Sequence, residues 1–413
     1  TMSGATFESL SIPAFRRLWA GGYLFSLAIF AQMVARGALA KDLEGSNAAL
    51  GAVTLAFGLT GLVTTPLGGV AADRFPKRRM LMISTGLLFA SSLWIAIAVQ
   101  FNFVTFWMLL VASAIQSAGF SGLLPARMAF TAELVGPSRL ANGIVLSQIS
   151  MNLNRVIGPV IAGVFLGLPT LGIGAVYWVS SVITASSALF FVSLPSGHPQ
   201  SNSPAPSAVT DLLDGIKYGL ATWPVPLLLM TSAFALFFGF PYVAFLPSVS
   251  EDLFSSGNTG YAWLSAVGAV GGLLAALAIA GRARGNVAWK IHNSAVVGFG
   301  FGIAALGASP SFGVAMVVMF GLGAATAAFQ SMNATLTLAS SEAAYHGRMQ
   351  SLLQLGFNFF GLAALPLGIC ADNFGLRKTL ISMGLVVVAV GIVSASVYRA
   401  KVDAQAMSIE QAR

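Results

Sequence analysis

Long apolar runs separated by short polar or glycine- and proline-containing breaks dominate the chain. Six runs in the first half are Leu18–Ala40, Leu50–Ala72, Met80–Gln100, Val104–Leu124, Ala141–Leu166 and Leu171–Leu194. Six in the second half are Val225–Ser248, Gly260–Ala280, Ile291–Ala308, Phe312–Ala339, Met349–Ala371 and Thr379–Tyr398. A membrane-spanning helix needs about 20 apolar residues. The pattern therefore predicts an all-α membrane protein with twelve transmembrane helices.

A polar stretch at residues 195–224 separates the two sets of runs. Proline, serine and asparagine are frequent from Pro195 to Ser207, and Val209–Thr222 mixes polar and apolar residues. This composition is typical of a linker followed by a short amphipathic helix at the membrane surface. We expect an N-terminal six-helix bundle at 1–194, a cytoplasmic linker at 195–224 and a C-terminal six-helix bundle at 225–413.

Composition excludes a soluble globular protein. The 413 residues are 56% hydrophobic and only 8% charged, whereas about 25% of the residues of a soluble domain are charged. The single cysteine, Cys370, excludes an intramolecular disulfide and a cysteine-based metal cluster. The three histidines lie far apart, and the chain has no phosphate-binding Gly-Lys-Ser/Thr. We expect no metal, no cofactor and no enzymatic activity.

The positive charges are distributed unevenly between the two sides of the predicted membrane. One side holds Arg16, Arg17, Arg74, Lys77, Arg78, Arg79, Arg127, Arg139, Lys217, Arg282, Arg284, Lys290, Arg348, Arg399, Lys401 and Arg413. The other holds only Lys41, Arg377 and Lys378. Cytoplasmic loops carry the excess of lysine and arginine. We therefore predict that both termini are cytoplasmic, and we attribute the net charge of +8 to topology rather than to nucleic-acid binding. We further expect a monomeric multi-pass protein of a bacterial inner membrane.

The second run ends in Gly69-Val-Ala-Ala-Asp73-Arg74-Phe-Pro-Lys77-Arg78-Arg79. This segment resembles the loop between helices 2 and 3 of the major facilitator superfamily, Gly-x-x-x-Asp-Arg-x-Gly-Arg-Arg/Lys, with Pro76 in place of the second glycine. The resemblance implies two pseudo-symmetric bundles that work by alternating access. It also implies that Asp73 latches onto the start of helix 11, with Gly69, Arg74 and Arg78 in the same gate. A plain charge at a membrane exit is the alternative.

The two halves show signs of duplication. Arg74 and Arg282 end the second and eighth runs and lie 208 positions apart, while Pro159 and Pro366 lie 207 positions apart in the fifth and eleventh runs. Two landmarks thus give nearly the same offset. Parallel repeats related by an axis along the membrane normal are described for major facilitator transporters.

The fifth run carries the strongest candidate for substrate contact. Gln148, Asn152, Arg155 and Pro159 recur at i, i+4, i+7 and i+11 and so share one stripe of a helix. An arginine near mid-span costs about 2.5–3.5 kcal/mol in lipid, so it must line a wet cavity or have a partner.

The run Asn154-Arg155-Val-Ile-Gly158-Pro159-Val-Ile-Ala-Gly163 also resembles the helix 5 signature of enterobactin-exporter-like and drug-efflux members. That resemblance implies that Arg155 faces the central cavity and that Gly158 and Pro159 serve the gate. A structural pin is the alternative role of Arg155.

Further polar residues lie within the predicted spans. Arg36 and Gln32 are one turn apart, and this arginine either faces the cavity, extends outward or pairs with Asp42 or Glu44. Other candidates for the cavity are Gln116, Gln330, Asn333 and Asn358. Such residues form either a polar binding chamber or hydrogen bonds between helices.

All thirteen acidic residues lie in loops or at the ends of spans. A pump for cationic drugs commonly uses a carboxylate within the membrane, because it can exchange a proton for the cargo. We therefore expect any proton or counter-ion coupling to use acids at the rim or the substrate itself. The predicted function is export of a small amphipathic molecule, neutral or anionic and siderophore- or drug-like. An uptake permease for a siderophore or organic anion, and a transporter-like lipid flippase or receptor, are the alternatives.

Overall fold

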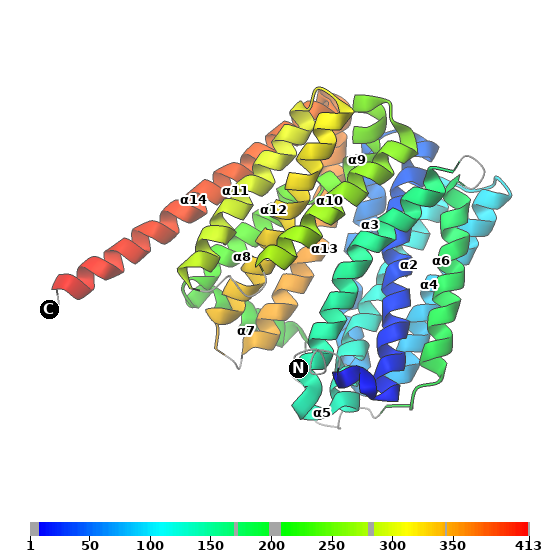
Figure 1. The fold of residues 1–413 in the computed structure, drawn as a ribbon, viewed down its shortest axis with the longest axis horizontal. Coiled ribbons are helices and arrows are strands. Elements are labelled where there is room, and N and C mark those ends of the chain that lie inside the picture. Colours follow the sequence, from blue (N-terminus) through cyan, green and yellow to red (C-terminus); the bar gives the residue numbers. More distant parts are fainter. Residues whose placement is uncertain (1–7, 169–171, 198–207, 280–284, 343–344, 412–413) are drawn as a thin grey trace.

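The computed structural model describes residues 8–168, 172–197, 208–279, 285–342 and 345–411. They form helices with short connections (Figure 1). The first half contains η1 (Glu8–Ser11), α2 (Pro13–Glu44), α3 (Asn47–Arg74), α4 (Lys77–Gln100), α5 (Phe106–Leu166) and α6 (Gly172–Val192). A linker helix follows, α7 (Ala208–Ala221). The second half contains α8 (Val225–Phe234), η2 (Ala235–Gly239), α9 (Tyr242–Ser248), η3 (Val249–Leu253), α10 (Gly257–Ile279), α11 (Asn286–Ala308), α12 (Phe312–Ala339), α13 (His346–Phe374) and α14 (Leu376–Gln411).

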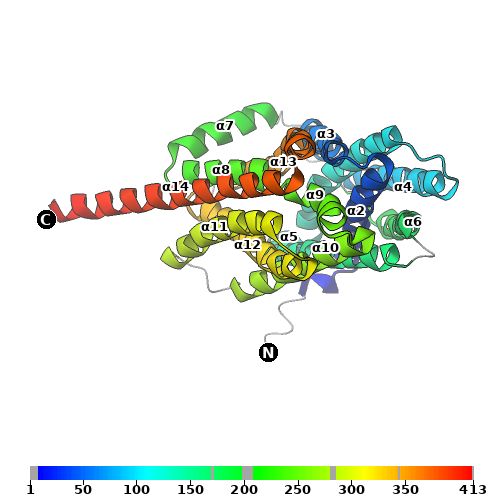
Figure 2. The ribbon, with the colours of Figure 1, turned by 90° about the horizontal axis from the view of Figure 1, so that it is seen from above.

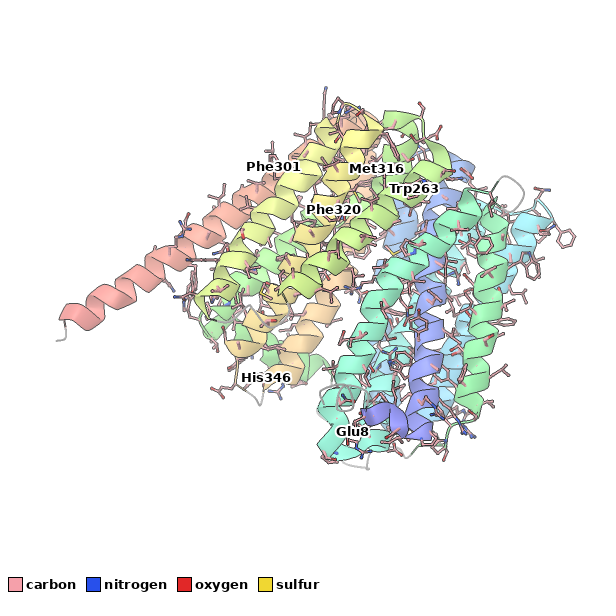
Figure 3. All side chains as sticks on the ribbon, in the orientation of Figure 1. Glu8, Trp263, Phe301, Met316, Phe320 and His346 are labelled. Atoms are coloured by element: carbon pink, nitrogen blue, oxygen red, sulfur yellow. The ribbon has the colours of Figure 1, made fainter. Side chains whose placement is uncertain are left out.

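Eleven helical stretches among the described residues are long and apolar enough to cross a membrane. Helix α13 supplies the twelfth, because its 29 residues extend over about 43 Å at 1.5 Å per residue. Large apolar side chains cover the outer surface, among them Trp263, Phe301 and Phe320 (Figure 3). The predicted all-α, twelve-helix membrane fold is confirmed.

The fourth span is longer than the apolar pattern predicted. The helix continues past Leu124 to Val135, and the chain then turns into the fifth span within the same element, α5. The turn lies at Gly136, whose positive φ of 71° suits glycine, and Pro137 follows it. Arg127 was placed in a segment between two spans, and that placement is wrong because it lies within the helix before the turn. The side chain is buried and donates to the carbonyl of Ser147 at 3.3 Å.

The seventh span, Val225–Leu253, is not uniformly α-helical. Between α8 and α10 the chain forms two π-helical turns, η2 and η3, on either side of α9. Proline has no N–H to donate and its ring clashes with the preceding turn. Pro241 directly precedes α9 and Pro247 lies inside it, which explains the altered hydrogen-bond pattern.

The two halves pack against each other through two equivalent helix pairs. Helix α3 packs on α13, and α5 packs on α10. The approach is close in both pairs. A Cβ atom on Gly58 would lie 2.9 Å from the Cα of Gly361, and one on Gly163 would lie 2.7 Å from the Cβ of Ala262. In the duplication inferred from sequence, spans 2 and 11 correspond to spans 8 and 5. The observed pairing therefore has the twofold relation that the repeat requires.

The molecule has two ends that differ in how the halves meet. The Asp372 face is the end where α2 ends, α3 begins and α13 ends; the Arg78 face is the opposite end, where α4 begins. Viewed from above, α4 and α6 lie toward one edge and α11 and α14 toward the other, with α3, α5, α10 and α13 between them (Figure 2). The ribbons of the two halves diverge toward the Arg78 face (Figure 1).

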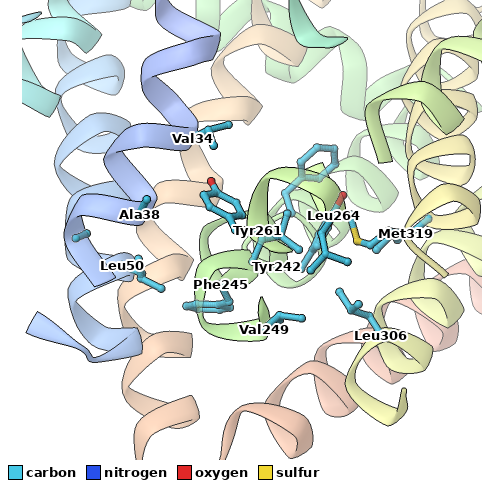
Figure 4. Packing of buried hydrophobic residues seen from close by; sticks show 14 of the residues in the cluster. Val34, Ala38, Leu50, Tyr242, Phe245, Val249, Tyr261, Leu264, Leu306 and Met319 are labelled. Atoms are coloured by element: carbon cyan, nitrogen blue, oxygen red, sulfur yellow. The ribbon is translucent and has the colours of Figure 1, made fainter. Parts of the chain in front are cut away.

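The hydrophobic core also differs between the two faces. One cluster joins both halves near the Asp372 face, where Val34 and Leu50 belong to the same core as Tyr242, Phe245 and Tyr261 (Figure 4). Toward the Arg78 face two further clusters each stay within one half. One contains Leu18, Met80 and Phe130, and the other contains Leu228, Trp289 and Leu336. The halves are thus closed together at the Asp372 face and separate at the Arg78 face.

Candidate substrate-binding site

Arg155 lies on the second part of α5 and reaches the opposite half. Its Nη1 donates to Oε1 of Gln330 on α12 at 3.4 Å, which is long for a hydrogen bond. The Arg155 side chain is nevertheless exposed. A guanidinium within a span does not face lipid without a large cost. The exposed side chain of Arg155 therefore lies between the two halves rather than against lipid.

The stripe predicted on this helix is distinct from its apolar surface. Gln148, two turns before Arg155, is also exposed. Val160 is 40% exposed and lies five positions from Arg155, about 140° around the helix, on a side suited to lipid. The side chain of Asn152 is outside the described part of the chain. Gln148 and Arg155 thus follow a polar line toward the Arg78 face.

Gly158 and Pro159 lie where α5 meets α2. A Cβ atom on Gly158 would lie 2.5 Å from the Cβ of Phe30 and 3.0 Å from the backbone nitrogen of Ala31. A side chain here would push the helices apart. Pro159 is half-buried within α5. Their assignment to a gate stays a prediction, but the close approach gives Gly158 a definite packing role.

Arg36 forms a buried polar chain rather than an outward-pointing side chain. Its Nη1 donates to Oε1 of Gln116 at 3.1 Å, and Nε2 of Gln116 donates to Oε1 of Gln32 at 2.7 Å. The guanidinium carbon also lies 4.8 Å from the ring centre of Phe57, a favourable cation–π distance. Of the alternatives left open by the sequence, the structure supports neither outward extension nor pairing with an acid. Neither arginine, Arg36 or Arg155, forms an ion pair among the described residues.

The remaining candidates point in different directions. Gln330 contacts Arg155. Asn333, one turn along α12, is buried and its Oδ1 lies 3.3 Å from Nε2 of His292 on α11. Asn358 of α13 lies against α3, where its Oδ1 would be 2.5 Å from a Cβ atom on Gly61. The structure therefore brings Gln330 to Arg155 but places Asn333 and Asn358 at separate helix contacts.

The predicted gate lies at the Arg78 face. The burial of Gly69 and the side chain of Asp73 are outside the described part of the chain, and Arg74 is exposed. Arg78 donates to the carbonyl of Leu194 at 3.0 Å and so ties the start of α4 to the end of the sixth span. The contact of Asp73 with the start of α13 stays a prediction.

The linker helix α7 docks on the start of α13. Arg348 Nη1 lies 2.7 Å from Oδ2 of Asp214 in an ion pair. The rings of Tyr218 and Tyr345 stack with centres 3.7 Å apart, and the hydroxyl of Tyr218 accepts from the backbone nitrogen of Glu342 at 2.8 Å. The C-terminal half therefore holds the linker through several polar contacts at the Arg78 face.

Three polar residues within or at the ends of spans form hydrogen bonds that the sequence did not predict. Asn154 donates to the carbonyl of Tyr23 at 2.8 Å, His292 bonds Asn333, and Asp372 bonds the start of α3. The partners of Asn154 and Asp372 lie 131 and 325 positions away in the sequence. Residues so far apart in the sequence leave no local sequence pattern that would predict their contact. Among the described residues, no group of three or more histidine, cysteine or acidic side chains could hold a metal ion.

The sequence profile of the Major Facilitator Superfamily matches residues 18–364. The staphyloferrin A transporter of Staphylococcus aureus is 22% identical over 342 residues, covering 80% of this chain and 83% of the relative. Macrolide efflux protein A of Streptococcus pyogenes is 21% identical over 389 residues, covering 92% and 94%. An MFS-type transporter of Bacillus subtilis, YfiS, is 24% identical over 184 residues, but the match spans only 42% of that relative's length and 44% of this chain.

A solved structure supports the same architecture. The nucleoside transporter NupG aligns over 93% of this chain and 99% of its own, with a TM-score of 0.72 and 15% sequence identity. At this identity the similarity concerns the fold alone.

Proposed function

The chain belongs to the major facilitator superfamily, and we propose that it is a secondary active transporter that exports a small amphipathic neutral or anionic molecule by alternating access. The family and its relatives are transporters, so the protein is not an enzyme. It is a multi-pass membrane protein. The finer proposal concerns the chemistry of the cargo, the direction of transport and the residues involved.

The observation that carries the proposal is Arg155 between the separated halves. Its guanidinium is exposed, contacts Gln330 only at 3.4 Å, and has no carboxylate partner among the described residues. Guanidinium groups present planar donors that match carboxylate geometry. Unpaired positive charge in a cavity raises the local concentration of anions. Arg36, also without an acidic partner, adds to this potential deeper toward the Asp372 face.

Charge distribution supports an orientation. The Arg78 face carries exposed cations such as Arg74, Arg79 and Lys290, whereas the Asp372 face has few. Under the positive-inside rule we assign the Arg78 face to the cytoplasm, in a bacterial plasma membrane, with both termini inside. The structure is then an inward-open state, closed to the outside. We keep the halves at 1–194 and 225–413, joined by 195–224.

One relative favours export, and the relatives do not fix the cargo. One is named a staphyloferrin A transporter and another a macrolide efflux protein. An inward-open cavity that attracts anions accepts cargo from the cytoplasm, and the driving gradient then sets the net direction. Because the described acids lie at the rims, coupling to a proton or counter-ion would act there or through the substrate itself.

Transport into proteoliposomes tests the proposal. Purified protein is offered fluorescent amphipathic carboxylates, their neutral methyl esters and matched amines, with and without a pH gradient. The carboxylates or esters should move and the amines should not. Arg155→Gln should reduce carboxylate transport by about tenfold, whereas Arg79→Gln, which removes an exposed cation from the rim, should change it little.

The same preparation separates the alternatives. In everted membrane vesicles, export appears as accumulation inside the vesicle. Accumulation by intact cells instead would identify an uptake permease. Movement of fluorescent lipid with none of the solutes would identify a flippase, and preferred transport of the amines would overturn the anionic assignment.

A further inference from the structure

Asp372, at the end of α13, binds the start of α3 in the opposite half. Its Oδ1 accepts hydrogen bonds from the backbone nitrogen and from Nδ2 of Asn47, at 2.8 and 2.9 Å. Its Oδ2 accepts from the backbone nitrogen of Ala48 at 2.9 Å. One carboxylate thus makes three hydrogen bonds across the interface between the halves.

These bonds complete the cap of α3. The first backbone N–H groups of a helix lack partners within the helix. Ser46 satisfies the N–H of Ala49 through its hydroxyl at 3.1 Å, and Asp372 satisfies those of Asn47 and Ala48. Two of the first three donors of α3 therefore depend on the other half. A carboxylate is the favoured group at this end because the helix dipole is positive there.

The backbone of the interface brings the two helices close enough for this contact. A Cβ atom on Gly368 would lie 2.9 Å from the carbonyl carbon of Asn47, and one on Gly51 would lie 2.7 Å from the Cα of Leu365. Glycine at these positions lets α3 and α13 pack directly. Asp372 lies one turn beyond Gly368, at the point where this seam reaches the Asp372 face.

We propose that Asp372 is a latch that holds the outer face of the transporter closed. This inference rests on the proposed alternating-access function. Opening the Asp372 face separates α3 from α13, so all three bonds must break together and the donors of Asn47 and Ala48 must turn to water. Asp372 is then a positioning residue: it touches no substrate, but it sets the balance between the inward-open and outward-open states.

A second contact at this face provides a matched comparison. Lys41 Nζ and Asp252 Oδ2 lie 2.8 Å apart and also join the two halves. Both acids are exposed, but Lys41–Asp252 is a single exposed ion pair, which contributes little, whereas Asp372 accepts three hydrogen bonds. Removing the Asp252 charge deletes a bond across the interface without uncapping a helix.

Distances between spin labels measured by double electron–electron resonance test the latch without any substrate. In a Cys370→Ser background, labels at Phe101→Cys and Ala308→Cys report on the Asp372 face, one in each half. Both positions are exposed. Asp372→Asn should increase the ratio of long to short distances by about tenfold. Asp252→Asn should change it less than about twofold.

A second label pair separates movement of the halves from local fraying of α3. Labels at Arg79→Cys and Lys290→Cys, both exposed at the Arg78 face, should move closer when Asp372→Asn opens the other end. Unchanged distances at either pair would overturn the latch. Asn47→Asp places a second negative charge next to Asp372 and should open the same face. This variant replaces Asp372→Asn in the experiment if Asp372→Asn does not fold.

Different experimental outcomes would contradict the latch proposal and the cargo proposal. Normal spin-label shifts with no transport of any offered anion would leave the latch standing and remove the cargo assignment. Unchanged distances in a variant that still transports anions would remove the latch alone.

Discussion

The guanidinium of Arg155 and the amide oxygen of Gln330 lie 3.4 Å apart, on helices that belong to opposite halves of the protein. This contact occurs where the shared core has ended and each half has its own hydrophobic cluster. It therefore lies between the two halves, on the Arg78 side of their shared core. A substrate anion that reaches Arg155 could replace the long bond to Gln330 with a shorter one.

Replacing Arg155 by lysine should impair transport although the charge is kept. An ammonium group is a point charge and cannot reproduce the planar set of five guanidinium donors. We expect carboxylate transport to fall by about tenfold, through a higher KM. Initial rates at varied substrate concentration measure this, with Arg79→Lys as the control. Equal KM values for Arg155→Lys and wild type would show that Arg155 does not bind the cargo.

The buried chain formed by Arg36, Gln116 and Gln32 should show coupled effects on stability. Gln116→Leu removes the hydrogen-bond acceptor of a buried guanidinium, which we expect to cost about 2–3 kcal/mol. Arg36→Met in addition removes the unpaired charge, so the double variant should recover at least half of that loss. Thermal unfolding in detergent of the wild type, the two single variants and the double variant measures this coupling. Simple addition of the two single effects would contradict the coupling.

A side chain at Gly58 should weaken the closed interface. Its Cβ atom would lie 2.7 Å from the carbonyl oxygen of Asn358 and 2.9 Å from the Cα of Gly361, both backbone atoms of α13. We expect Gly58→Ala to force α3 and α13 apart and to lower thermal stability by about 1–3 kcal/mol.

The matched control for Gly58 is Gly86→Ala in α4. No atom lies within 4 Å of a Cβ atom there, so the substitution should stabilise the protein by about 0.5–1 kcal/mol through helix propensity. The two variants should move the unfolding temperature in opposite directions. A loss of stability in both would point to a general effect of alanine rather than to the seam.

The linker helix should detach when its polar contacts are removed. Asp214→Asn together with Tyr218→Phe deletes the ion pair to Arg348 and the hydrogen bond to Glu342. We expect faster proteolysis within residues 195–224, by several-fold, because exposed ion pairs and single hydrogen bonds contribute about 1 kcal/mol each. Limited proteolysis with mass spectrometry measures the cleavage rate. An unchanged rate would show that other contacts hold α7.

Apolar run length was sufficient to predict the spans, because lipid selects for it directly. The predicted ends of the spans were wrong where a polar residue lies inside a continuing helix. Arg127 marked a loop in the sequence, yet the helix continues and buries it beside Gly22, where a Cβ atom would lie 2.8 Å from Nη1 of Arg127. Pro241 and Pro247 lie in an apolar run, so hydropathy alone did not show that the seventh span contains π-helical turns.

The polar positions were easier to find than their partners. The spacing of Gln148 and Arg155 placed them on one stripe, and the cost of a charge in lipid indicated a polar environment. Nothing in the local sequence indicates that Arg36 bonds Gln116 rather than an acid, or that Asn333 turns toward His292. Those contacts depend on how each helix is rotated about its axis, which tertiary packing decides.

The central claim is that Arg155 borders water between the two halves. In a Cys370→Ser background, Arg155→Cys should react with a membrane-impermeant thiol reagent applied from the cytoplasmic side, about tenfold or more faster than Val160→Cys, which lies on the apolar side of the same helix. Protection of Arg155→Cys to the level of Val160→Cys would contradict the account.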